Sequence, residues 1–325
     1  MEYIRTHTVE FPTGRSCRLV VDSPSGATVV EGRDVDRATI QVVAHLWEDT
    51  ADDADDTMAR VVRSIRHENG SVRIEVPSLR SGGPWFLFGR GSRVELQIAV
   101  PRDTAARIVS RSGRVEIGRI SGPLEVEQRS GRATVAGIDR DVRIASRSGA
   151  VDVESVGADV TIQSRTGKVT AREVRGNLSI QSRTGAVRVE RMDGRVDIES
   201  RTGRTVVERV RGDVRVVTTT GAIGVAEAGG SVHLQATTGA VRLRSAIRGD
   251  VDIRVTTGAI VLEVDPRHPF FLDAETTTGR ITSDLEPRRQ GAPPAGAPSV
   301  RLRAVTGAIR IARLPPGTAG WPDEE

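Results

Sequence analysis

Polar and apolar positions alternate along most of this chain, in short runs that recur at a fixed interval. From residue 113 to residue 239 a Ser/Thr-Gly pair repeats with its glycine every 18 residues, and the series continues with wider steps at Gly258, Gly279 and Gly307. Counted from each leading glycine, the second, fourth, seventh, eleventh and thirteenth positions are mostly Val, Ile or Leu. Alternation with a period of two is typical of strands that bury one face. Each interval therefore predicts two short β-strands.

A single interval of this kind cannot bury its apolar face, whereas stacked intervals can. Equivalent side chains would then lie about 4.8 Å apart, one strand spacing, in columns through a narrow interior. The predicted fold is all-β: a single-stranded parallel β-solenoid, or β-helix, with 18-residue coils of two short strands each. Glycine would form the corners because tight corners need a positive φ. We expect a right-handed coil because parallel crossovers are mostly right-handed.

Three other repeat architectures fit the pattern less well. A calcium-binding β-roll needs Gly-Gly-x-Gly-x-Asp corners, and no ladder of aspartates follows the glycines here. A left-handed hexapeptide helix would place aliphatic residues every six positions, and a β-propeller would repeat at about 40 residues. The 18-residue period thus favours the parallel solenoid.

The repeat is regular over residues 94–286 and looser at both ends. Residues 1–93 predict an irregular β N-terminal cap and the first coils, in which residues 52–66 form a short helix or an exposed loop. Residues 287–299 are rich in Pro and Gly and predict a loop. Residues 300–325 predict a last coil and a C-terminal tail.

Aromatic residues lie mainly outside the regular coils, where they are expected to cap the open ends of the sheets. One group stands in a glycine-framed segment, Gly82 to Gly89, and consists of Trp85, Phe86 and Phe88. The alternative role for this group is an apolar contact loop that meets a partner or a membrane surface.

Arginine supplies nearly all of the positive charge, and the formal net charge is +4. Arginines occupy the sixteenth position of successive coils and should point outward. They are Arg111, Arg129, Arg147, Arg165, Arg183 and Arg201. Such a ridge would suit a linear polyanion, because the guanidinium fork pairs well with phosphate and carboxylate groups.

The other interpretation of this ridge is a solvated surface whose charge is offset by nearby carboxylates. The candidates for that offset are Glu127, Glu154, Glu190 and Glu199. Beyond Arg201 the same position changes to Thr219 and Thr237. No aromatic residues interleave with the arginines, so the pattern contains no specific nucleic-acid motif.

Few residues suggest chemistry. The five histidines show no metal-ligand spacing, and the lone Cys17 excludes a disulfide framework. Four aspartates between Asp52 and Asp56 could hold a cation loosely, but a solvated acidic loop explains them as well. We find no phosphate-binding loop and no distinguishable nucleophile. The sequence thus predicts no catalytic residues, no metal and no cofactor.

The repeated Ser/Thr-Gly-x-Val-x-Val units, such as residues 148–153, are similar to those of the bacterial "putative adhesin" family. The lead-in strand at 94–101, closed by Pro101, is similar too, and the resemblance covers residues from about 20 to about 311. It implies a β-strand-repeat domain of unknown function and brings no catalytic residues with it.

The leading functional hypothesis is a non-enzymatic structural or interaction scaffold, adhesin-like in fold, whose ligand is unknown. The alternative is a polyanion-binding module that uses the arginine ridge. A third interpretation, a β-helix enzyme acting on carbohydrate, lacks the long substrate-binding loops such enzymes need.

The expected partners are an unknown protein or an anionic polymer, with end-to-end self-association as a further possibility. The N-terminus shows no apolar leader, and no apolar run is long enough to span a membrane. The expected location is therefore cytoplasmic, or the cell surface if a leader has been removed.

Overall fold

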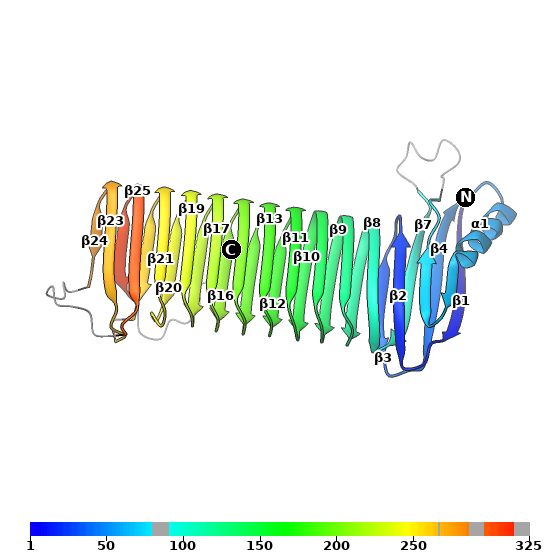
Figure 1. Ribbon diagram of the computed structural model, residues 1–325. Helices are drawn as coiled ribbons and strands as arrows, with labels where there is room; N and C mark the ends of the chain where they lie inside the picture. Colours follow the sequence, from blue (N-terminus) through cyan, green and yellow to red (C-terminus); the bar gives the residue numbers. More distant parts are fainter. Residues whose placement is uncertain (80–90, 266, 286–295, 315–325) are drawn as a thin grey trace. The chain divides into compact units, whose positions relative to one another are not determined.

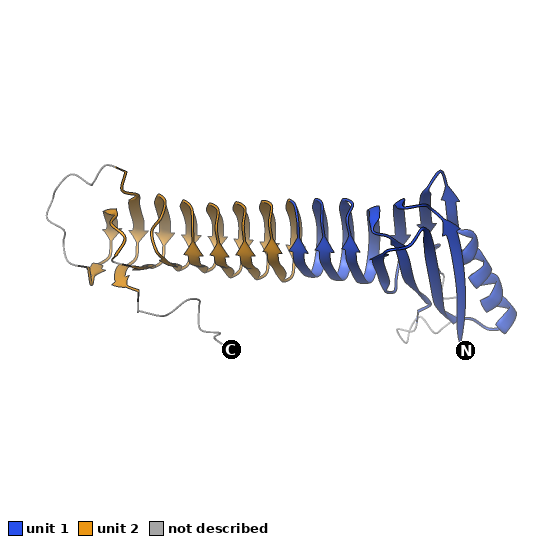
Figure 2. Cartoon of the chain, turned by 90° about the horizontal axis from the view of Figure 1, so that it is seen from below, with its two compact units in different colours: residues 1–158 blue, residues 159–325 orange. Residues whose placement is uncertain are grey.

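The computed structural model of this chain describes residues 1–79, 91–265, 267–285 and 296–314 (Figure 1). The chain divides into two compact units, residues 1–158 and residues 159–325 (Figure 2). Strands dominate both units, and successive coils pair in parallel. The predicted parallel β-solenoid with two strands per coil is confirmed.

The regular coils of unit 1 are carried by β8 (Asp103–Ile120), β9 (Leu124–Ile138) and β10 (Val142–Val156). Each of these strands continues through a glycine corner, and neighbours pair in parallel with a register shift of 18 residues. Val126, for example, pairs with Ile144, and Ala133 pairs with Val151. The sequence period therefore equals one physical coil.

The first coil of unit 1 is formed by a segment far upstream of β8. It consists of β2 (Ser16–Ser23) and β3 (Thr28–Arg33), and both strands run parallel to β8. On its other side β3 pairs with β7 (Arg93–Pro101). The upstream coil therefore lies between β7 and β8 in that sheet, although β7 and β8 follow each other in the sequence.

The remaining N-terminal elements extend the two faces of the coil, with antiparallel pairs throughout except that β6 runs parallel to β2. In one sheet β1 (Glu2–Pro12) pairs with β4 (Arg37–Trp47), which pairs with β7. In the other, β5 (Ile65–Glu68) pairs with β6 (Ser71–Glu75), which pairs with β2. Helix α1 (Ala51–Arg63) contacts β1 and β4 and buries Ala54, Thr57, Met58 and Val61. Of the two expectations for this segment, the helix is confirmed.

Unit 2 contains coils that are each built from a pair of separate strands. Odd-numbered strands pair with odd and even with even, in parallel, from one coil to the next. The strands are β11 (Val160–Thr166), β12 (Val169–Val174), β13 (Leu178–Thr184), β14 (Val187–Met192), β15 (Val196–Thr202), β16 (Thr205–Val210), β17 (Val214–Thr220), β18 (Ile223–Ala228), β19 (Val232–Thr238), β20 (Val241–Ser245), β21 (Val251–Thr257) and β22 (Ile260–Val264).

The last two coils of unit 2 are stacked out of sequence order. One is formed by β23 (Phe271–Thr278) and β24 (Ile281–Ser283), the other by β25 (Ser299–Thr306) and β26 (Ile309–Arg313). Strand β21 pairs with β25, and β25 pairs with β23 on its far side. The coil that comes last in the sequence is therefore inserted before its predecessor. Its inward side chains are nearly fully buried, whereas those of β23 and β24 are partly or fully exposed.

Glycine forms one corner of each coil because the backbone of the preceding coil leaves no room for a side chain. Gly185 adopts φ +141°, and a Cβ built there would lie 1.9 Å from the carbonyl oxygen of Gly167. The same close approach recurs at each leading glycine from Gly203 to Gly258. The repeated glycine is thus a packing requirement as well as a conformational one.

A second corner was not predicted. The sixth residue after the leading glycine adopts a left-handed conformation, with φ between 55° and 59° in the non-glycine cases. These residues are Arg119, Ser155, Glu173, Arg191, Arg209 and Glu227, and Gly137 takes the same place at φ +67°. This corner turns the chain so that the seventh residue points inward.

Candidate functional site

The six predicted arginines lie at the corner that precedes each leading glycine, and all six are exposed. Unit 1 holds Arg111, Arg129 and Arg147. The residues flanking them are in register, since Ser110 pairs with Gln128 and Ser112 with Ser130. The three arginines are therefore about 4.8 Å apart from coil to coil, one strand spacing. We call them ridge 1.

Unit 2 holds the corresponding ridge 2, formed by Arg165, Arg183 and Arg201. Its flanking residues pair in the same way, with Ser182 between Ser164 and Ser200 in the ladder. Each unit thus carries three arginines whose backbone positions lie in a line. Two unit charges held one strand spacing apart in water would repel each other by about 0.9 kcal/mol.

The ridge arginines form no ion pair with any residue that the structure describes, although many other arginines do. The carboxylates expected to offset this charge either form ion pairs with other arginines or form no ion pair with the ridge arginines. Glu127 pairs with Arg107 at 2.7 Å, and Glu190 pairs with Arg172 at 3.7 Å and with Arg209. Within the described ranges, Glu154 and Glu199 form no pair with the ridges either. Among the described residues, no carboxylate forms an ion pair with either ridge.

A column of buried polar residues lies beside the ridge corner, and the sequence pattern did not reveal it. The residue before each ridge arginine is buried; these residues are Ser110, Gln128, Ser146, Ser164, Ser182 and Ser200. Gln128 donates from Nε2 to the carbonyl oxygens of Gly113, at 2.8 Å, and Ser130, at 3.2 Å. This side chain ties the corner that carries Arg129 to the preceding coil. The signal in the sequence was a run of polar residues, mostly serine, at a position that the alternation places inward.

Beyond ridge 2 the same corner changes from charged to neutral. Thr219 and Thr237 occupy the arginine position and are exposed, and the residues that follow, Thr220 and Thr238, are exposed as well. The corner therefore keeps its hydroxyl groups but loses its charge, which confines an electrostatic site to the coils that carry arginine.

The remaining sequence candidates divide into structural residues and residues outside the described ranges. Thr50 caps α1 by accepting a hydrogen bond from the Asp53 amide at 3.1 Å, and Asp55 pairs with Arg5. The acidic cluster thus belongs to a helix N-terminus, where negative charge is favourable. The described residues contain no group of side chains that could hold a metal ion. Trp85, Phe86 and Phe88 lie outside the described residues.

The single thiol is not an activated nucleophile. Cys17 is buried, and this burial raises the pKa of its thiol, which disfavours the thiolate. No helix in the described ranges combines the length and apolar character needed to cross a membrane.

The family model described as Toastrack DUF4097 matches residues 29–293, most of the chain. This chain therefore belongs to the Toastrack family, a domain of unknown function with a β-helix-like fold. The match confirms the predicted family resemblance. No curated protein matches the chain.

Two solved structures are similar to this chain at 11% identity each. One is a putative cell adhesion protein from Clostridium sporogenes, with a TM-score of 0.22, covering 96% of this chain and 100% of its own. The other is a putative lipid binding protein from Parabacteroides distasonis, with a TM-score of 0.34, covering 94% of this chain and 96% of its own. These TM-scores are low, and neither neighbour bears on the function of this chain.

Proposed function

We propose that this chain is a non-enzymatic binding scaffold, adhesin-like in architecture, that holds linear anionic polymers along ridges 1 and 2. One observation carries the proposal: in each unit three exposed arginines occupy equivalent corners of successive coils, and none of the six forms an ion pair with a described residue. An anionic polymer would relieve the repulsion within each ridge and would release its own counterions on binding.

The rigid backbone ladder beneath the ridges favours this function. Backbone pairing fixes the spacing of the arginines before any ligand arrives, so binding does not have to order the coil. Each guanidinium can form paired hydrogen bonds with a phosphate or carboxylate group. A repeating polymer can therefore engage several identical groups at once, which suits a scaffold better than a catalyst.

Long-chain polyphosphate and polygalacturonate, each labelled with a fluorophore, test the proposal by anisotropy, with neutral dextran as the reference. Two triple variants remove one ridge each. They are Arg111→Ala with Arg129→Ala and Arg147→Ala, and Arg165→Ala with Arg183→Ala and Arg201→Ala. A third variant, Arg140→Ala with Arg175→Ala and Arg248→Ala, removes the same charge from exposed positions eight or nine residues after a leading glycine.

We expect the wild-type chain to bind at least one of the two polyanions and to lose affinity steeply between about 50 and 200 mM NaCl. Each ridge variant should reduce the slope of log K against log[salt] by about 2, at roughly 0.7 for each lost contact. The third variant should change this slope less. Equal slopes and affinities in the ridge variants and the wild type would reject the ridges as the binding site.

A further inference from the structure

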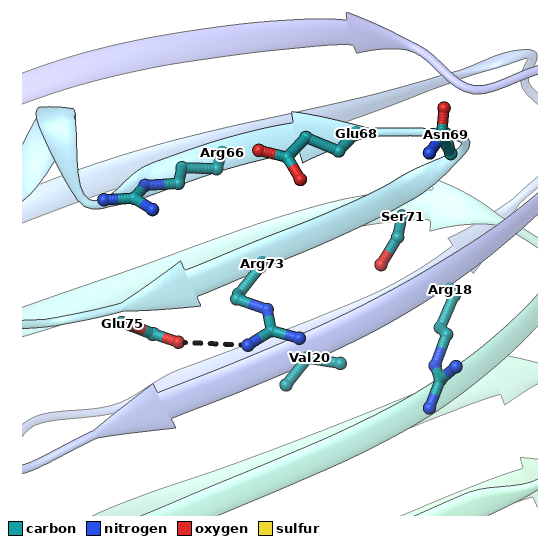
Figure 3. Close-up of a pocket in the computed structure, with 8 residues that line it drawn as sticks. All are labelled: Arg18, Val20, Arg66, Glu68, Asn69, Ser71, Arg73 and Glu75. Atoms are coloured by element: carbon teal, nitrogen blue, oxygen red, sulfur yellow. Dashed lines mark hydrogen bonds and ion pairs between the residues drawn. The ribbon is translucent and has the colours of Figure 1, made fainter.

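Unit 1 contains a second cluster of arginines, on the outer face of its N-terminal strands. A cleft of about 620 Å³ lies over β2, β5 and β6, and Arg18, Arg66 and Arg73 line it (Figure 3). Glu68 and Glu75 line the same cleft. None of the ridge arginines borders it, so this site is independent of the proposed function.

Strand pairing brings the charged residues of this cleft together. Strands β5 and β6 are antiparallel, and Arg66 lies directly opposite Arg73. The next strand, β2, places Arg18 beside Ser71. Two like charges that face each other across a pair of strands destabilise the sheet unless something compensates them. Figure 3 draws the two guanidinium groups turned apart, and both side chains are exposed, so the strand pair carries an excess of positive charge that an anion can offset.

The protein itself compensates this charge only in part. Arg73 and Glu75 form an ion pair at 3.4 Å, and both side chains are about 60% exposed, so the pair stabilises little. Among the residues that the structure describes, Arg66 and Arg18 have no carboxylate partner. Glu68 lies in the cleft without pairing with either of them, as Figure 3 shows.

We propose that this cleft binds a phosphate-type oxyanion carried on a small polyhydroxyl group. Arg66 and Arg73 would hold the oxyanion between their planar forks, which match phosphate oxygens in a bidentate way. Arg18 approaches from the neighbouring strand β2. Glu68 is an acceptor for a hydroxyl of the same ligand, and its negative charge disfavours a phosphate that has no hydroxyl arm to reach it.

Isothermal titration with inorganic phosphate and with glycerol 3-phosphate tests this site. A double variant, Arg66→Gln with Arg73→Gln, removes the facing pair, and both side chains are exposed, so the fold should survive. We expect glycerol 3-phosphate to bind more tightly than inorganic phosphate. The double variant should weaken glycerol 3-phosphate binding at least tenfold, while the ridge 1 variant should leave it unchanged.

A variant with increased affinity distinguishes the loss of binding contacts from misfolding, because a misfolded chain would not bind more tightly. Glu68→Gln removes a negative charge from the cleft and should strengthen the binding of inorganic phosphate several-fold. Vesicles that contain phosphatidylglycerol, whose headgroup glycerol has free hydroxyls, distinguish a lipid headgroup from a free ligand. Binding to these vesicles that is lost in the double variant would assign the same chemistry to a membrane source. No binding of any of the three probes, or equal binding by the double variant and the wild type, would overturn the proposal.

Discussion

At the scale of single residues, each coil depends on two backbone corners of different kinds. Replacing Gly185 with alanine should destabilise the fold by about 3 kcal/mol, because φ +141° is unfavourable for alanine and its Cβ would lie 1.9 Å from the Gly167 carbonyl oxygen. Equilibrium unfolding in urea measures the change. A loss below about 1 kcal/mol would show that the coils can separate to admit a side chain.

The corner at the sixth position should respond in the opposite direction. Glu227 adopts φ +56°, which is costly for a residue with a Cβ, and Gly137 takes the equivalent place in unit 1. Glu227→Gly should therefore be neutral or stabilise the fold by up to about 1 kcal/mol, after the backbone entropy cost of glycine is included. The same urea titration measures it, and a clear destabilisation would mean that the Glu227 side chain contributes more than its backbone strain costs.

At the scale of elements, the exchanged order of the last two coils predicts unequal costs for two leucines. Leu302 of β25 is fully buried between two neighbouring coils, whereas Leu272 of β23 is only half-buried at the outer side of that coil. We expect Leu302→Ala to cost about 3 kcal/mol and Leu272→Ala about 1 kcal/mol. Thermal and chemical unfolding of the two variants measures both values. Equal costs would contradict the exchanged order.

The elements also show which features of the fold could be predicted from the sequence. Period-two alternation and the 18-residue glycine spacing were sufficient to predict the coils, their strands and the outward arginines, because each depends on local geometry alone. The placement of β2 and β3 beside β8, and of β25 before β23, depends on which distant segment buries its apolar face best. The arginine cleft could not be predicted for the same reason, since pairing of β2 with β6 brings Arg18 near Arg73 across more than 50 residues of sequence.

At the scale of the molecule, a stack of equivalent coils should tolerate the loss of one whole coil. Deleting residues 187–204 joins Ala186 to Thr205. Thr205 then takes the place of Val187 and pairs with Val169. Each coil contacts chiefly its neighbours, so stability should fall by one coil and its interface while the fold persists. Far-UV circular dichroism and thermal melting measure the outcome.

The matched control removes half a coil. Deleting residues 196–204 places Arg209 in the buried column of Ser200 and moves the buried Val210 to the exposed place of Arg201, so cooperative melting should be lost. The whole-coil deletion also removes Arg201 from ridge 2, and its polyphosphate binding should lose about 0.7 from the salt slope, one contact, without losing affinity altogether. If the whole-coil deletion unfolds as the half-coil deletion does, the coils are not interchangeable units. If it folds and keeps the wild-type slope, Arg201 does not contact the polymer.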